Sequence, residues 1–208
     1  MIRAFLFDIG NVIVRFDFSR AIRAVAALSD VADEAAALQR IDEVKLVYED
    51  GRMSRDAFLK EAFALLDYRG TREEFIAAWQ DIFWPNEPMH TLIRSLHGRY
   101  PIHLLSNTND IHVEGLFRDF DVFKCVTTGV YSHEVRASKP HPRIYEIACE
   151  KCGIDPATTF FIDDLAANIE AARAAGFQGH HYHHDRHDAL LADLRSAGIE
   201  QVSISPCH

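Results

Sequence analysis

The chain begins with the stretch Ile-Arg-Ala-Phe-Leu-Phe-Asp at residues 2–8, a largely apolar run that stops at the carboxylate Asp8. A short run of this kind is typical of a strand buried on both faces of a sheet. Similar runs return after residue 100 and alternate with segments of helical periodicity. We expect these strands at residues 102–105, 122–128, 159–162 and 179–183, and helices at 110–118, 143–152, 168–175 and 188–197. This alternation predicts a parallel sheet covered by helices on both faces.

Between Phe18 and His97 the sequence shows helical periodicity only. Ser54 and Thr71 are typical helix N-caps, and Thr71 with Glu74 fits a capping box. The apolar stripes of these helices predict a core of their own. We therefore expect a helical domain over residues 15–98, inserted after the first strand of an α/β core formed by residues 1–14 and 99–208.

Length and charge narrow the classes of function. The 208 residues fit one domain, or one domain with a large insertion. The 22 basic and 31 acidic residues give a formal charge of −9, which argues against nucleic acid or an anionic membrane as a partner. A small phosphorylated ligand, which needs only one or two local cations, is not excluded. The chain has no apolar run of about 18 residues, no signal-peptide pattern and only four scattered cysteines. We expect a cytoplasmic monomer or homodimer.

Polar residues stand where the predicted strands of the core end. They are Asp8, the pair Ser106-Asn107, Lys139 and the pair Asp163-Asp164. In parallel α/β sheets the ligand crevice lies outside the carboxyl ends of the strands, so these residues are candidates for one site. Carboxylates are ligands of a hard cation such as Mg²⁺. A hydroxyl and a lysine suit a phosphate.

This order of motifs resembles the haloacid dehalogenase superfamily of hydrolases. Asp8 matches the nucleophile of the first motif, Ser106 the phosphate ligand of the second and Lys139 the lysine of the third, while Asp163 and Asp164 match the acidic fourth motif. The residues of these motifs are most similar to those of bacterial glucose-1-phosphate phosphatases and of the phosphatase domain of soluble epoxide hydrolase. The resemblance implies strand order 3-2-1-4-5, and it implies that the inserted helices form a four-helix cap over the site.

The resemblance also implies a mechanism, in which Asp8 attacks phosphorus and forms an aspartyl phosphate. Mg²⁺ would be held by Asp8, by the backbone carbonyl of Gly10 and by Asp164, with Asp163 binding directly or through water.

Three more residues take roles from the resemblance. Lys139 would pair with Asp8 and with the phosphate, which keeps Asp8 ionised. Ser106 and the backbone N–H of Asn107 would bind phosphoryl oxygens. The implied function is a Mg²⁺-dependent phosphatase for a small phosphorylated metabolite, such as a sugar phosphate.

Gly10 departs from the family pattern, because most family phosphatases carry an aspartate there as general acid and base. The loss matters, since such a group contributes roughly 10²–10⁴-fold. Asp17 or a residue of the cap could supply the proton, or the substrate could have a good leaving group. The chain could also be a C–X hydrolase, since dehalogenases lack this aspartate, or a catalytically weak member that binds a phosphometabolite. The doubled acid Asp163-Asp164 favours the phosphatase, because a dehalogenase needs no metal.

Specificity is expected to come from the cap. The candidates near its junction with the core are Arg15, Phe16, Tyr48, Glu49 and Trp84. Six of the twelve histidines lie between His180 and His208, and no motif connects them to catalysis. Alternation along a strand would point the neighbours His180 and His181 in opposite directions.

Overall fold

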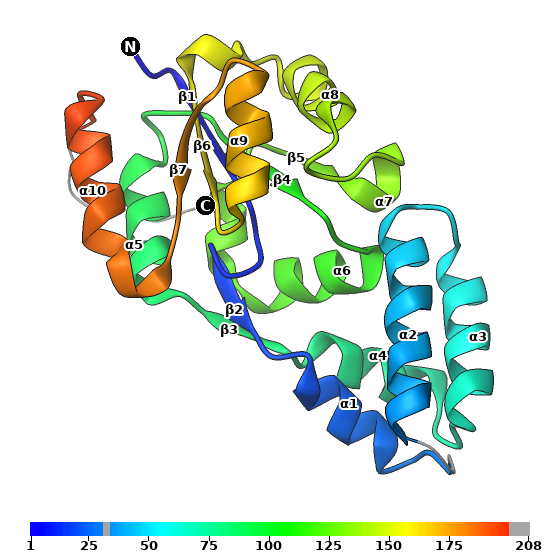
Figure 1. The fold of residues 1–208 in the computed structure, drawn as a ribbon. Coiled ribbons are helices and arrows are strands. Elements are labelled where there is room, and N and C mark those ends of the chain that lie inside the picture. The colour runs from blue at the N-terminus through cyan, green and yellow to red at the C-terminus, as the bar shows by residue number, and fades with distance from the viewer. Residues whose placement is uncertain (31–33, 200–208) are drawn as a thin grey trace.

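The computed structural model describes residues 1–30 and 34–199, and for residues 34–38 the backbone only. Its centre is a parallel five-stranded sheet in the order β5-β4-β1-β6-β7 (Figure 1). The strands are β1 (Ala4–Phe7), β4 (Ile102–Ser106), β5 (Thr128–Tyr131), β6 (Thr159–Asp163) and β7 (Gln178–His181). Counted along the core this order is 3-2-1-4-5, so the predicted fold class and strand order are confirmed. Cys207 and His208, counted above, lie outside the described residues.

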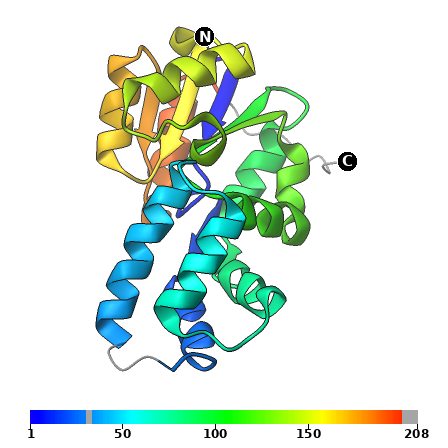
Figure 2. The same ribbon diagram turned by 90° about the vertical axis from the view of Figure 1, so that its right-hand side faces the viewer.

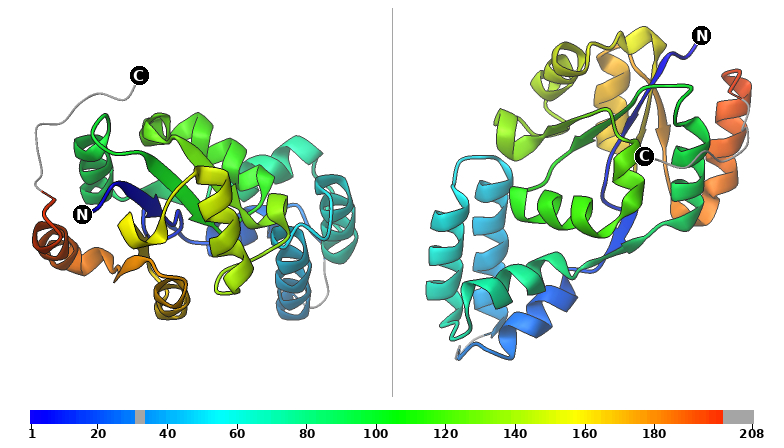
Figure 3. Two further views of the ribbon diagram at one scale, coloured as in Figure 1. Left: turned by 90° about the horizontal axis from the view of Figure 1, so that it is seen from above. Right: turned by 180° about the vertical axis from the view of Figure 1, so that it is seen from behind.

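Helices cover both faces of the sheet. They pack on side chains of both faces, because alternate residues of β1 point to opposite sides. Phe5 and Phe7 pack on one side, and Leu6 packs on the other. The first side is covered by α5 (Glu87–Leu96) and α10 (His187–Ser196), the second by α8 (Pro142–Cys152) and α9 (Ala166–Ala174), as Figures 1 and 3 show. The core also contains α6 (Asp110–Asp119) and α7 (Ser132–Val135), and the 3-10 turns η1 (Asp121–Cys125), η2 (Pro156–Thr158) and η3 (His184–Arg186). Within the described residues no helix is long and apolar enough to cross a membrane.

The strand predicted at residues 122–128 is wrong in its position. Residues Asp121–Cys125 form η1, and the strand that pairs with β4 starts only at Thr128. Val122 and Phe123 are buried in the apolar cluster that α5 contributes to. Their apolar pattern therefore comes from a short helical turn that packs on neighbouring helices. In so short a run, the apolar pattern of a buried helical turn cannot be told from that of a strand.

A second apolar cluster lies in the inserted segment. It is built by α1 (Ser19–Ala26), α2 (Glu34–Glu49), α3 (Arg55–Leu66) and α4 (Arg72–Gln80), with Phe58, Phe75 and Trp79 among its fully or almost fully buried side chains. The predicted capping box at the start of α4 is present, since the Thr71 hydroxyl accepts from the Glu74 backbone N–H and the Glu74 carboxylate accepts from Thr71 N–H. Figure 2 shows α2 and α3 as a pair of helices below the sheet.

A two-stranded antiparallel ribbon joins this helical unit to the sheet. It consists of β2 (Val14–Phe16) and β3 (Phe83–Pro85), and no strand was expected in this segment. The backbone N–H of Asp17 donates to the carbonyl of Ile82 and closes the ribbon on its helical side. Helix α5, which follows the ribbon, packs on the sheet through Met89 and Leu92. We therefore propose that the cap runs from about residue 17 to residue 82, inside the expected range of 15–98.

Candidate active site

Three adjacent strands end in the polar residues that the sequence singled out. Asp8 follows β1, Ser106 is the last residue of β4 and Asp163 is the last residue of β6. Because β1 lies between β4 and β6 and runs parallel to both, these ends meet at one edge of the sheet. The cap helices lie on the side toward which β1 runs (Figure 2).

Lys139 joins two of the three strand ends. Its Nζ lies 2.9 Å from Asp8 Oδ1 and donates to Asp163 Oδ2 at 2.6 Å. All three residues are buried; Asp163 has no exposed surface. Burial opposes the charge of Lys139, but Asp8 and Asp163 outweigh it and raise the pKa of the ammonium above its usual value. Lys139 is therefore a fixed positive charge between the two carboxylates.

The side chain of Asn107 holds the backbone of Lys139 in place. Asn107 Oδ1 accepts from Lys139 N–H at 2.8 Å, and Asn107 Nδ2 donates to the Lys139 carbonyl at 2.9 Å. This pair ties the end of β4 to the loop that carries the lysine. The sequence indicated a role only for the backbone N–H of Asn107, and this role of the side chain was not predicted.

Asp163 and Asp164 are neighbours with different environments. Asp163 Oδ1 accepts from Leu165 N–H at 2.8 Å and from Asn168 Nδ2 at 2.9 Å, so both of its oxygens have donors. Asn168 thus orients the carboxylate of Asp163. Asp164 is only partly buried and accepts from Asn11 Nδ2 at 3.1 Å. Of the pair, Asp164 is the freer metal ligand.

The donor set at this edge fits a divalent cation. Asp8, Asp163 and Asp164 each place a carboxylate oxygen within 4.8 Å of the others. Three carboxylates and the one lysine leave a charge of about −2, and hard cations such as Mg²⁺ prefer oxygen ligands. Burial raises the pKa of Asp8 to about 6 against the opposing effect of Lys139, and burial also raises the pKa of Asp164. A cation would favour the ionised form of both groups.

The structure explains how Gly10 fits its position. A Cβ atom built on Gly10 would lie 3.1 Å from Cε1 of the Phe16 ring. The edge of the Phe16 ring would have to shift by a few tenths of an ångström to admit a side chain at position 10, so the ribbon packs closely against this glycine. The next residue, Asn11, has a φ of 54° and directs its side chain toward Asp164.

A cavity of about 160 Å³ lies between the sheet edge and the cap. The core contributes Gly10, Ser106 and Asn107 to its wall. The ribbon and cap contribute aromatic and apolar residues and two charged side chains of α2, Lys45 and Glu49. Of the residues named as specificity candidates, Phe16 and Glu49 line this cavity, whereas Arg15 stacks over the Trp84 ring on the ribbon.

Asp17 does not face this cavity. Its Oδ1 accepts from Ser19 N–H at 2.9 Å at the start of α1, and nearly half of its side chain is exposed. Hydrogen bonds from Ser19 lower its pKa. Asp17 therefore caps a helix, and the alternative that it is the missing general acid has no geometric support.

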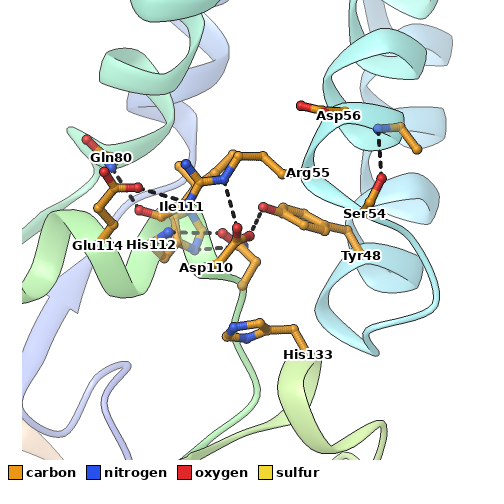
Figure 4. A network of polar contacts seen from close by, with 12 residues as sticks. Tyr48, Ser54, Arg55, Asp56, Gln80, Asp110, Ile111, His112, Glu114 and His133 are labelled. Atoms are coloured by element: carbon orange, nitrogen blue, oxygen red, sulfur yellow. Dashed lines mark hydrogen bonds and ion pairs between the residues drawn. The ribbon is translucent and has the colours of Figure 1, made fainter.

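Polar contacts join α2 and α3 of the cap to α6 of the core, as Figure 4 shows. Tyr48 of α2 donates its hydroxyl to Asp110 of α6, and Arg55 of α3 donates to the other oxygen of Asp110 at 2.7 Å. Arg55 also donates to Glu114 at 2.9 Å. Tyr48 was expected near this junction, but its partner was not predicted, because the contacting residues are 55 or more positions apart in the sequence.

The histidines near the C-terminal end lie beside this edge, and Nε2 of His181 contacts the backbone carbonyl of Asp164 at 2.9 Å. His180 is buried and pairs with Asp193 at 2.7 Å, whereas His181 is exposed, so the alternation predicted along β7 is confirmed. His183, His184 and Asp185 could together hold a metal ion, but two of the three are exposed to solvent.

Comparison with known proteins identifies the family. A family model described as haloacid dehalogenase-like hydrolase matches residues 2–176. The D-ribitol-5-phosphate phosphatase of Bacteroides thetaiotaomicron is 29% identical over 189 residues, 86% of this chain and 90% of that protein. (S)-2-haloacid dehalogenase 4A of Burkholderia cepacia is 23% identical over 120 residues, 58% of this chain and 52% of that protein.

A solved structure matches the fold and contains a metal. It is a haloacid dehalogenase family enzyme of Bacteroides thetaiotaomicron in complex with magnesium and inorganic phosphate, and it matches with a TM-score of 0.73 at 27% identity. The match covers 86% of this chain and 93% of that one. The family model spans Asp8, Ser106, Lys139 and the pair Asp163-Asp164. The chain belongs to the haloacid dehalogenase-like hydrolases.

Proposed function

We propose that this hydrolase is a Mg²⁺-dependent phosphatase that acts on a small phosphorylated metabolite. The observation that carries the proposal is the buried cluster of Asp8, Asp163 and Lys139 with Asp164 at its rim. Such a cluster, with a charge of about −2, would repel a phosphate dianion or a haloacid unless a cation is bound. Because halide leaves without a metal, a dehalogenase would have no bound cation to offset the repulsion between three carboxylates and its anionic substrate.

The residues of the cluster have distinct roles in this proposal. Asp8 attacks phosphorus, the bond from phosphorus to the leaving oxygen breaks, and the phosphoryl group is left on Asp8. Water then hydrolyses the aspartyl phosphate. Lys139 favours the ionised form of Asp8, so that the nucleophile is an anion at neutral pH. Ser106 Oγ and the backbone N–H of Asn107 donate to the phosphoryl oxygens.

The proposed metal ligands are Asp8, the backbone carbonyl of Gly10 and Asp164. Asp163 contributes through water, because both of its oxygens already accept hydrogen bonds. When bound, Mg²⁺ neutralises charge between the nucleophile and the phosphoryl group.

A small polyol or sugar phosphate is the proposed substrate class. An apolar cavity of roughly 150 Å³ accommodates a molecule the size of benzene, so the cavity here suits a leaving group of about that size. The similarity to a D-ribitol-5-phosphate phosphatase over most of both chains supports the same class. Such metabolites belong to the cytoplasm, which is the location that we propose.

A phosphoester panel tests the proposal. The purified protein is assayed with 4-nitrophenyl phosphate and with sugar and polyol phosphates, in Mg²⁺ or in EDTA, and chloride release from 2-chloropropionate is measured in parallel. We expect phosphate release in Mg²⁺ that stops in EDTA and returns when Mg²⁺ is added in excess. Turnover that survives EDTA contradicts the metal-dependent mechanism. Chloride release favours the dehalogenase, and tight binding of one phosphoester without turnover favours a binding protein.

A further inference from the structure

The proposed reaction lacks a proton donor for the leaving group. An alkoxide is a poor leaving group, and a general acid that protonates it contributes roughly 10²–10⁴-fold. Gly10 has no side chain, Phe16 occupies the adjacent space and Asp17 caps α1 instead of facing the cavity. If the substrate is an alkyl phosphate, another group in the cavity must donate.

The last turns of α2 present two charged side chains to the cavity. Lys45 and Glu49 are four residues apart, so they share one face of the helix. Both line the same cavity as Gly10 and Ser106. Lys45 is engaged by Asp42 at 3.2 Å, whereas the Glu49 carboxylate accepts a long hydrogen bond of 3.4 Å from Asn109 Nδ2. Glu49 is thus the carboxyl group that faces the phosphate-binding residues across the cavity.

We propose that Glu49 is the general acid of this hydrolase and replaces the aspartate that the family carries at position 10. The proposal rests on the phosphatase function proposed above. As Asp8 bonds to phosphorus, the electron pair of the breaking P–O bond goes to the leaving oxygen, and the Glu49 carboxyl proton moves to that oxygen. An alcohol and the Glu49 carboxylate result. The carboxylate then takes a proton from the water that attacks the aspartyl phosphate, and Asp8 and protonated Glu49 are restored.

The surroundings of Glu49 favour a carboxyl group that keeps its proton near neutral pH. Burial raises the pKa of Glu49 to about 7, Lys45 and the hydrogen bond from Asn109 oppose the rise, and Asp50 and Asp42 add to it. The neighbours from α6 add no positive charge at this pH, since Asn109 is neutral and burial lowers the pKa of His112 to about 3. General acids work best when their pKa lies near the working pH.

The backbone around Glu49 is fixed on the core. Its carbonyl accepts from Ser132 Oγ at 2.6 Å, and the next residue, Asp50, accepts from Ser138 Oγ at 2.6 Å. Gly51 follows with a φ of 68°, and a Cβ there would lie 2.2 Å from the carbonyl oxygen of His133. The turn after α2 is therefore pressed against α7, which holds Glu49 at the cavity through contacts that its side chain does not make.

Leaving-group dependence tests the proposal. Wild type, Glu49→Gln and the control Glu43→Gln, which alters an exposed carboxylate on the same helix, are assayed with 4-nitrophenyl phosphate and with the alkyl phosphate that wild type hydrolyses fastest. Nitrophenolate leaves without a proton. We expect Glu49→Gln to lower kcat/KM for the alkyl phosphate by roughly 10²–10⁴-fold and that for the aryl phosphate by less than about 10-fold. The wild-type loss of alkyl phosphate turnover above about pH 7 should be absent in Glu49→Gln.

Any other outcome contradicts either the role of Glu49 or the proposed function. Equal losses on both substrates, or no loss on either, mean that Glu49 is not the acid, while the phosphatase function stands. The same preferential loss in Glu43→Gln also overturns the proposal. If wild type hydrolyses neither substrate in Mg²⁺, the proposed function fails and the inference fails with it.

Discussion

At the carboxyl edge of the sheet, Lys139 lies 2.9 Å from Asp8 and 2.6 Å from Asp163, whereas at the end of α2 the Glu49 carboxylate accepts a long hydrogen bond of 3.4 Å from Asn109. One wall of the cavity is formed by the sheet edge, whose strands pair with neighbours on both sides. The second belongs to a cap joined to the core by a ribbon and by side-chain contacts. The charged side chains of the sheet edge are thus held by short contacts and the Glu49 carboxylate by a long one. Under the proposed function the first wall binds the phosphoryl group and the second contacts the leaving group.

Replacement of the nucleophile should have the largest effect. Asp8→Asn keeps the shape of the side chain but removes the attacking anion, so we expect kcat to fall by at least about 10⁴-fold. The fold should survive, because one of three clustered carboxylates is neutralised. Steady-state kinetics and thermal unfolding of the same samples measure both effects. Retained turnover in this variant would show that Asp8 is not the nucleophile.

Loss of the lysine should affect stability most strongly. Lys139→Met leaves Asp8 and Asp163 buried without their shared cation, and removal of one partner of a buried ion pair costs about 3–5 kcal/mol. Urea unfolding in EDTA measures the free energy, and Mg²⁺ should restore part of it. A loss of less than about 1 kcal/mol would show that the sheet edge is not preorganised by this charge.

Acid should weaken the side of α6 that faces the cap. Burial lowers the pKa of His112 to about 3, so the folded state favours the neutral ring. Its contribution to stability is complete above the ordinary histidine pKa of about 6.5 and is lost as the pH falls from there toward 3. His112→Gln should therefore reduce the pH slope of the free energy of unfolding between pH 6 and 4 by about 1.4 kcal/mol per pH unit. Above pH 7 the free energy of unfolding should change with pH in the same way in both proteins. Identical slopes below pH 6 would contradict the lowered pKa of His112.

The contact between Tyr48 and Asp110 should have the smallest effect. Tyr48→Phe removes a hydrogen bond across the cap boundary, which we expect to cost about 1 kcal/mol and to raise KM more than it lowers kcat. Arg72→Ala is the matched control, because it breaks an exposed ion pair with Asp56 within the cap. If both variants behave alike in unfolding and kinetics, the Tyr48 contact does not hold the cap.

The parts of the fold that were predictable are those with a local pattern. The strands around Asp8 and Asp163 are continuous apolar runs with a polar end, and the capping box at Thr71 lies within four residues. The short ribbon of β2 and β3 has no such signal, because each strand is three residues long and pairs with a partner almost seventy residues away. The apolar residues of η1 were misassigned for a related reason, since packing on helices and pairing in a sheet select the same side chains.

Local patterns were enough to indicate the family, the parallel sheet and the four motifs, because motif residues and strand periodicity lie within short stretches of chain. Only the folded chain shows which acidic side chains line the cavity. In the sequence Asp17 was a candidate acid and Glu49 a candidate for specificity, yet Asp17 accepts from the backbone at the start of α1 and Glu49 lines the cavity. The physical reason is that the environment of a side chain, and with it the pKa, depends on residues such as Ser132 that fold against it from far along the chain.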